Sequence, residues 1–160
     1  RGYDLVIFCY LFQYFIESEP IKVSSNGAAF LQDNIYDTSL TSLTYANNIH
    51  GHIFVSWLHP FKEHRLVVSG SKGMIRFEDS AENKPLMIYD KGIDWIEGNP
   101  VKRDGPAELV PYESNMPLTE ELKYFINHLK KRPQIANGKN GIEVVKILNK
   151  ASESMLGKTP

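Results

Sequence analysis

The chain has 160 residues, of which 42% are hydrophobic and 23% are charged. These proportions are typical of one globular domain, so we expect residues 1–160 to form a single domain with one core. The formal net charge of −1 provides no field that would attract nucleic acid or an anionic membrane surface. The single cysteine, Cys9, excludes an internal disulfide and is typical of a reducing compartment, so we expect a cytoplasmic protein.

Residues 4–16 predict a helix that is apolar on most of its sides, and the apolar stretch at residues 5–16 is interrupted only by Gln13. The apolar stretch is too short to span a bilayer, which needs about 20 residues. It also lacks the small-residue cleavage site of a secretory signal. We therefore expect no membrane association and a helix that is covered by other elements, with Cys9 as a small core residue.

The following segments predict strands connected without intervening helices. They cover residues 21–31, 37–45, 51–58, 65–69, 74–77 and 85–89. Gly27 indicates a bulge or a close contact, and Asn47 and Asn48 predict a hairpin turn because asparagine tolerates positive φ. Strands in direct succession favour antiparallel pairing, so the sequence predicts an α+β fold with a mostly antiparallel sheet.

The remainder of the chain predicts one long loop and two helices. Residues 90–116 are rich in glycine, proline and charge, and we expect a loop with one strand at residues 107–111. The first helix has Thr119 as its predicted cap, and the second begins at Asn140 with Glu143 in a capping-box-like pair. Each helix has one apolar face, so we expect each to pack on one side of the sheet.

Most catalytic and metal-binding motifs are absent. Gly70-Ser71-Lys72-Gly73 lies between two predicted strands and lacks the spacing of a phosphate-binding loop, so it predicts a hairpin turn. No serine lies in a nucleophile elbow, and no pair of carboxylates is spaced for acid–base catalysis. The candidate metal ligands His50, His52, His59 and His64 have no cysteine pair or carboxylate that completes a set, so we expect no metal site.

One polar corner follows the strand at residues 51–58, and two interpretations of it remain open. It contains Trp57, His59, Lys62, His64 and Arg65 around a proline. Cations beside an aromatic ring suit a sugar, a phosphate or a carboxylate. Charged residues also protect an exposed sheet edge from pairing with other chains.

The same residues resemble the C-terminal domain of the glucose–fructose oxidoreductase / inositol dehydrogenase / MocA (Gfo/Idh/MocA) family, and its nucleotide-sugar dehydrogenase branch above all. The motifs that carry the resemblance are Ser56-Trp57-Leu58-x-Pro60-x-Lys62-x-x-Arg65, Gly70-Ser71-Lys72-Gly73-Met74, Glu121-Leu122-x-x-Phe125 and Gly141-Ile142-x-Val144-Val145. The resemblance implies an open, mostly antiparallel sheet with helices packed on one face. In the family, the bare face of the sheet commonly contacts another subunit, so the resemblance also implies a homo-oligomer.

Complete members of this family carry an N-terminal Rossmann domain for NAD(P) and act on a sugar hydroxyl or carbonyl carbon. The 160 residues contain no Gly-x-Gly-x-x-Gly and no Glu-Lys-Pro motif, so NAD(P) is expected only if a Rossmann domain is supplied elsewhere, for example by a partner in trans. Tyr3 and Val6 occupy the positions of the family's His-x-x-Asp pair, and valine cannot transfer a proton.

We therefore expect no catalytic residue in this chain. The substrate-binding candidates that the resemblance implies are Tyr3, Trp57, His59, Lys62 and Arg65. Three hypotheses remain: the C-terminal domain of an NAD(P)-dependent sugar or nucleotide-sugar oxidoreductase that transfers no hydride alone; a stand-alone module for sugar binding or oligomeric assembly; or part of an active dehydrogenase whose other half is encoded upstream.

Overall fold

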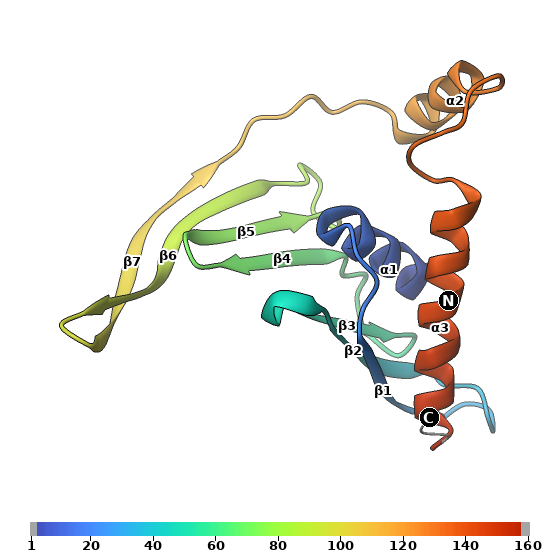
Figure 1. Ribbon diagram of the computed structural model, residues 1–160, viewed down its shortest axis with the longest axis horizontal. Helices are drawn as coiled ribbons and strands as arrows, with labels where there is room; N and C mark the ends of the chain where they lie inside the picture. The colour runs from blue at the N-terminus through green and yellow to red at the C-terminus, as the bar shows by residue number, and fades with distance from the viewer. Residues whose placement is uncertain (1–2, 158–160) are drawn as a thin grey trace. The chain divides into compact units, whose positions relative to one another are not determined.

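The computed structural model describes the backbone of residues 3–157 and the side chains of residues 5–157 (Figure 1). Within these residues the chain contains three α-helices, one short 3-10 helix and seven strands in two sheets. The chain divides into two compact units, one formed by Arg1–His59 with Leu122–Pro160 and the other by Pro60–Glu121. The predicted α+β class and the open antiparallel pairing are confirmed, with the strands shared between two sheets.

The first unit contains the sheet β1-β2-β3, built from Lys22–Ala28, Thr38–Thr44 and His50–Ser56. All pairings in this sheet are antiparallel. Ser25, Thr41 and Ile53 lie opposite one another across the three strands and are all buried. Because side chains alternate between the two faces of a strand, this row marks the covered face of the sheet.

Two helices cover that face, as the prediction of helices on one face requires. Helix α1 (Tyr3–Ile16) packs against β3, and helix α3 (Gly138–Met155) runs along β1 (Figure 1). Their apolar residues meet the sheet in one core, which contains Cys9, Leu43, Tyr45, Ile53, Val144 and Ile147. Cys9 is fully buried, so its predicted place in the core is confirmed.

Two local predictions in this unit are confirmed by backbone geometry. Asn47 and Asn48 both have a φ of 59° and form the short 3-10 helix η1 (Ala46–Asn48) between β2 and β3. Gly27 lies so close to its neighbours that an added Cβ would come within 2.7 Å of the Thr38 carbonyl oxygen. Glycine is required there by close approach of the backbone, not by a positive φ.

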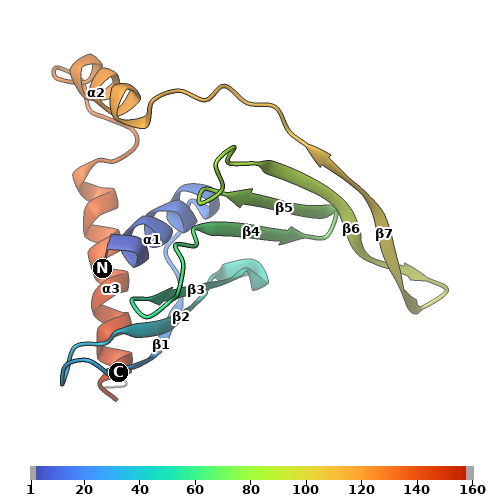
Figure 2. The ribbon, with the colours of Figure 1, turned by 180° about the vertical axis from the view of Figure 1, so that it is seen from behind.

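The second unit contains the antiparallel sheet β4-β5-β6-β7, formed by Arg65–Gly70, Gly73–Glu78, Leu86–Ile96 and Asn99–Leu109 (Figure 2). The predicted turn at residues 70–73 is confirmed, since Gly70 and Gly73 face each other at the end of the hairpin.

The prediction of a loop over residues 90–116 is wrong for most of its length. Residues 90–96 and 99–109 belong to the two long strands β6 and β7, which meet at a tight turn of Glu97 and Gly98 with φ of 51° and 80°. Lys91 pairs with Asp104 at 2.9 Å and Arg103 with Asp90 at 2.8 Å. Strand β7 is largely exposed, and charged residues interrupt residues 90–109, so this segment lacks the apolar alternation by which strands are recognised.

The two closing helices also differ in detail from the prediction. Helix α2 spans Pro117–Asn127, and none of its residues is buried. The expectation that its apolar face packs on a sheet is therefore wrong, because Leu122, Phe125 and Ile126 stay more than half exposed. Amphipathic spacing shows which face of a helix is apolar, but not whether the same chain covers it.

Helix α3 begins at Gly138, earlier than predicted. Its cap is Asn137, whose side chain accepts a hydrogen bond from the Asn140 N–H while the Asn140 side chain accepts one from the Asn137 N–H. The predicted pair of Asn140 and Glu143 is thus replaced by a pair three residues upstream. Of the helices in residues 3–157, none combines the length and the apolar composition that a bilayer span demands.

Candidate functional site

The predicted polar corner is divided between the two units. Trp57 and His59 belong to the first unit, whereas Lys62 and Arg65 belong to the second. The Trp57 backbone N–H donates to the Asp37 carbonyl oxygen at 2.8 Å, and its side chain is exposed. This anchors Trp57 at the end of β3, but the structure does not bring the four residues together within one unit.

Arg65 is held by two carboxylates. Its guanidinium lies 2.7 Å from Glu78 and 2.5 Å from Glu63. The hydrogen bond to Glu78, with the charges of Glu63 and Glu78, raises the pKa of Arg65. In turn, hydrogen bonds from Ser80 and Arg65 lower the pKa of Glu78. The charge of Arg65 is therefore already compensated within the second unit.

The other residues named in the prediction are Tyr3, Val6 and Lys62. The side chain of Tyr3 lies outside the described residues. Val6 is partly buried and packs against the core, as its apolar character dictates. Lys62 is exposed. No finding tests the assignment of these residues to substrate, so it stays a prediction.

The histidines weighed as metal ligands have other partners. His50 hydrogen-bonds Asn48 at 3.1 Å, and His52 hydrogen-bonds Ser42 at 3.1 Å. In the second unit, His64 Nδ1 lies 3.6 Å from an Asp79 carboxylate oxygen. In residues 3–157, no three ligating side chains come close enough to hold a metal ion.

The first unit contains a cleft of about 440 Å³ between α1 and the beginning of α3, which we name the α1–α3 cleft. Such a volume lies within the usual range of small-molecule sites. Its lining residues come from three segments, namely α1 and the link after it, the loop before α3, and the first turns of α3. They are Tyr10, Gln13, Tyr14, Glu17, Ser18, Glu19, Gln134, Ile135, Lys139, Asn140 and Glu143.

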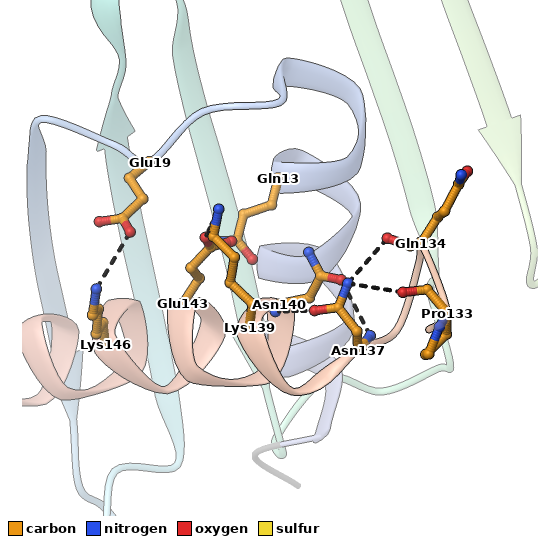
Figure 3. Close-up of polar contacts among 9 residues, drawn as sticks. All are labelled: Gln13, Glu19, Pro133, Gln134, Asn137, Lys139, Asn140, Glu143 and Lys146. Atoms are coloured by element: carbon orange, nitrogen blue, oxygen red, sulfur yellow. Dashed lines mark hydrogen bonds and ion pairs between the residues drawn. The ribbon is translucent and has the colours of Figure 1, made fainter. Parts of the chain in front are cut away.

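Gln13 is the one polar interruption of residues 5–16 of α1, and it lines this cleft. It is 7% exposed, and its amide Nε2 donates to Glu143 at 3.4 Å. Figure 3 shows Gln13 reaching from α1 toward Glu143 and Lys139 on α3. Its carbonyl Oε1 is buried and has no hydrogen-bond donor among the described residues.

Two tyrosine hydroxyls fix the loop that forms another wall. The Tyr124 hydroxyl accepts hydrogen bonds from the backbone N–H groups of Gln134 and Ile135, each at 3.1 Å. The Tyr10 hydroxyl accepts one from the Ala136 N–H at 3.0 Å. Asn137 donates to the Pro133 and Gln134 carbonyl oxygens, as drawn in Figure 3. The loop is therefore held in place before any ligand arrives.

Acidic groups outnumber basic groups in the lining. The carboxylates are Glu17, Glu19 and Glu143, and the single cation is Lys139, which lies 3.7 Å from Glu143. Lys146, outside the lining, pairs with Glu19 at 3.3 Å (Figure 3). The cleft thus offers carboxylate and amide oxygens beside the two aromatic rings of Tyr10 and Tyr14.

Few features of the sequence indicate this cleft. Residues 10–19 and 134–143 are far apart in the chain, and no local pattern predicts that they meet. The isolated polar position of Gln13 was the one available signal, because a buried polar group needs a hydrogen-bond partner. Glu143 was assigned to a helix cap, whereas it accepts a hydrogen bond from Gln13.

Comparison with known families finds one match. Residues 3–76, just under half of the chain, match the model of the GFO/IDH/MocA C-terminal domain. No curated protein matches the chain.

Comparison with solved structures extends the likeness of fold to nearly the whole chain. UDP-N-acetylglucosamine 3-dehydrogenase GnnA from Acidithiobacillus ferrooxidans matches with a TM-score of 0.79 and 20% identity, over 96% of this chain and 48% of that one. Aldose-aldose oxidoreductase from Caulobacter crescentus, complexed with glycerol, matches with a TM-score of 0.70 and 15% identity, over 96% and 44%.

A third match is the WlbA dehydrogenase from Bordetella pertussis, in complex with NADH and UDP-GlcNAcA. Its TM-score is 0.65 and its identity 16%, over 96% of this chain and 41% of that one. The chain therefore spans about half the length of the proteins whose fold it shares.

Proposed function

We propose that this chain is the C-terminal part of an NAD(P)-dependent sugar or nucleotide-sugar oxidoreductase, because residues 3–76 match the model of the GFO/IDH/MocA C-terminal domain. The observation that carries the proposal is the match of 96% of this chain to about half of GnnA. The names of the matched proteins suggest the substrate class, since they include a UDP-N-acetylglucosamine 3-dehydrogenase and an aldose-aldose oxidoreductase.

In this proposal the 160 residues contribute to substrate binding and do not transfer hydride alone. They contain no Gly-x-Gly-x-x-Gly, so NAD(P) would be bound by a Rossmann domain elsewhere in the protein or in a partner. Val6 packs in the core and cannot act as an acid or base. Tyr3, Trp57, His59, Lys62 and Arg65 stay the proposed substrate contacts.

A thermal-shift titration with UDP-N-acetylglucosamine tests the substrate class. We expect stabilisation of the chain that decreases in Lys62→Ala, because removing a cation weakens the hold on a diphosphate. Lys72→Ala, which removes an exposed lysine from the turn between β4 and β5, should leave the shift unchanged. If both variants lose the thermal shift equally, the sugar nucleotide binds only through non-specific charge attraction.

Hydride transfer is tested by the absorbance of NADH. Mixing the chain with NAD⁺ and the same sugar nucleotide should produce no NADH. Steady formation of NADH by the purified 160-residue chain would contradict the proposal, because it would require a cofactor site within these residues.

The alternative function is a stand-alone module for sugar binding or assembly. Whether the chain is such a module or part of an oxidoreductase, one observation favours a role in assembly. Val68, Ile75 and Ile88 lie in one row across β4, β5 and β6, and each is more than 40% exposed. A contiguous apolar row of this kind is typical of an interface. We propose a homo-oligomer that uses this face of the sheet, located in the cytoplasm.

A further inference from the structure

Asp37 lies at the point where the loop after β1 enters β2, and its carboxylate is enclosed by the protein. Of the carboxylates in residues 5–157, only that of Asp37 belongs to a buried residue, with 6% of its surface exposed. A charged group is costly to bury unless hydrogen bonds compensate it. The partners of Asp37 therefore show what its burial achieves.

Those partners are backbone groups of two separate segments. Asp37 Oδ2 accepts hydrogen bonds from the backbone N–H groups of Phe30 at 2.6 Å and Leu31 at 2.8 Å. The N–H of Asp37 donates to the Ala28 carbonyl oxygen at 2.9 Å, and its carbonyl oxygen accepts from the Trp57 N–H at 2.8 Å. Hydrogen bonds to an ionised acceptor are about twice as strong as neutral ones. One residue thus joins the loop between β1 and β2 to the residue that follows β3.

The loop between β1 and β2 is held by its backbone, because its large apolar side chains are not packed. Phe30 and Leu31 are 70% and 69% exposed. Further along the loop, the Ile35 N–H donates to the Gln32 carbonyl oxygen at 3.2 Å, and Asn34 has a φ of 64°. The carboxylate of Asp37 therefore supplies at this end of the sheet the order that an apolar core supplies elsewhere.

Trp57 lies at the same end of the sheet as this loop. Ala28, Thr38 and Ser56 form the last paired row of the three strands, and Trp57 follows that row directly. The side chain of Trp57 is 60% exposed, and its backbone N–H is bound to Asp37. A contact residue whose backbone is already fixed loses less conformational freedom when a ligand binds.

We propose that Asp37 is a positioning residue for substrate binding. Its carboxylate fixes the loop between β1 and β2 and thereby its own backbone, and its carbonyl oxygen then fixes the backbone of Trp57. Trp57 meets the sugar nucleotide, whereas Asp37 acts only through Trp57. This inference rests on the proposed function, because Trp57 is assigned to substrate only there. All of these residues lie in the first unit.

The fluorescence anisotropy of Trp57 tests the coupling without any ligand. The chain has two tryptophans, so the Trp95→Phe background leaves emission from Trp57 alone. In this background we expect Asp37→Ala to lose anisotropy, because the freed backbone lets the indole move on the nanosecond timescale. Asp37→Asn should lose less, since its amide oxygen still accepts N–H groups. Asp33→Ala removes an exposed carboxylate from the same loop and should change nothing.

Calorimetric titration with UDP-N-acetylglucosamine tests the consequence for substrate. We expect Asp37→Ala to bind about tenfold more weakly than the unmodified chain, and Asp37→Asn to lie between them. Ser25→Ala is the control for stability. It removes a hydroxyl that is buried in the middle of the same sheet and lies 2.9 Å from the Thr41 hydroxyl, so it weakens the sheet away from the loop. Ser25→Ala should leave both the affinity and the anisotropy unchanged.

The outcomes separate positioning from a structural role and from the proposed function. Unchanged anisotropy in Asp37→Ala overturns the proposal, as does an equal loss of affinity in Ser25→Ala. Lowered anisotropy with unchanged affinity would also overturn it, while the proposed function stands. If the unmodified chain does not bind the sugar nucleotide, the proposed function fails, and the anisotropy still decides whether Asp37 fixes Trp57. If circular dichroism shows that Asp37→Ala does not fold, Asp37→Asn supplies both measurements.

Discussion

The two units of this chain obtain their stability in different ways. In the first unit, α1 and α3 bury Cys9, Leu43 and Ile53 against one face of β1–β3. In the second, Pro60–Glu121, no side chain is buried. A regular antiparallel sheet can thus form without a buried core of its own, and its stability then depends on what covers it.

The ion pairs within the second unit are weak because their side chains are exposed. Lys91 and Lys102 hold Asp104 at 2.9 and 3.0 Å and lower the pKa of its carboxyl to about 2. All three side chains are well exposed, and ion pairs at exposed positions contribute little to stability. We therefore expect the first unit to resist unfolding by itself and the second to rely on association.

Truncating a core residue of the first unit should give the largest effect. Leu43→Ala is expected to lower the free energy of unfolding by about 3 kcal/mol, because Leu43 is 1% exposed and the variant leaves a cavity. Ile88→Ala in the second unit, where the side chain is 44% exposed, should cost less than about 1 kcal/mol. Urea denaturation at one fixed protein concentration measures both, and equal losses would contradict the difference between the units.

Charging the apolar row of the second unit should disrupt association. Val68 and Val67 are neighbours on β4 and point to opposite faces, with Val68 in the row of Ile75 and Ile88. Val68→Asp is expected to weaken self-association about thirtyfold, about 2 kcal/mol, whereas Val67→Asp should not. Light scattering over a dilution series measures the effect, and equal behaviour of the two variants would place the interface elsewhere.

Removing the cap of α3 should have a smaller effect on the first unit. Asn137→Ala breaks the capping box and is expected to cost about 1 kcal/mol. Asn149→Ala changes the same residue type at an exposed position within α3 and serves as the control. Thermal unfolding followed by circular dichroism compares them, and a control as unstable as Asn137→Ala would show that the cap is not the cause.

The smallest expected effect is a dependence on alkaline pH that is confined to the first unit. Burial raises the pKa of Cys9 from 9.0 to about 12, and burial followed by the charge of Cys9 raises that of Tyr45 from 10.0 to about 12. Both groups ionise more readily in the unfolded chain. Their contribution to stability is thus complete below about pH 9 and is lost as the pH rises toward 12.

Tyr45→Phe should reduce that loss. Its hydroxyl has no hydrogen-bond partner in the part of the chain that the structure describes, so removing it should cost little at neutral pH. Urea midpoints at neutral and alkaline pH give the measurement, with the exposed Tyr14→Phe as the control. A variant that keeps the full alkaline loss would exclude Tyr45 as its source.

The sequence predicts those parts of the fold whose signals are local. Apolar and polar residues alternate over residues 37–45 and 51–58, and Asn47 and Asn48 between them suit a turn. Both signals predict the β2–β3 hairpin, which the structure contains. Most of the β6–β7 hairpin between residues 90 and 106 escapes prediction because charged residues, glycine and proline interrupt its apolar pattern. The Glu97-Gly98 pair is its one local mark, since glycine suits the positive φ of such turns.

The two candidate sites, the polar corner and the α1–α3 cleft, also differ in how far the sequence predicts them. Trp57, His59, Lys62 and Arg65 are close in sequence, which is why they were predicted as a group. The ion pairs of Arg65 with Glu63 and Glu78 depend on the pairing of β4 and β5. The α1–α3 cleft depends on a tertiary contact between segments more than 100 positions apart, such as that of Gln13 with Glu143, and single-sequence patterns contain no information of that kind.

The most direct test of the account is a titration of the purified chain with NADH, followed by the fluorescence of the nicotinamide. We propose that these residues provide the substrate side of an oxidoreductase and that a separate dinucleotide-binding domain provides the cofactor side. We therefore expect no saturable binding at NADH concentrations up to about 1 mM. Binding with a dissociation constant near about 1 µM would contradict it, because the cofactor would then be held by the 160 residues themselves.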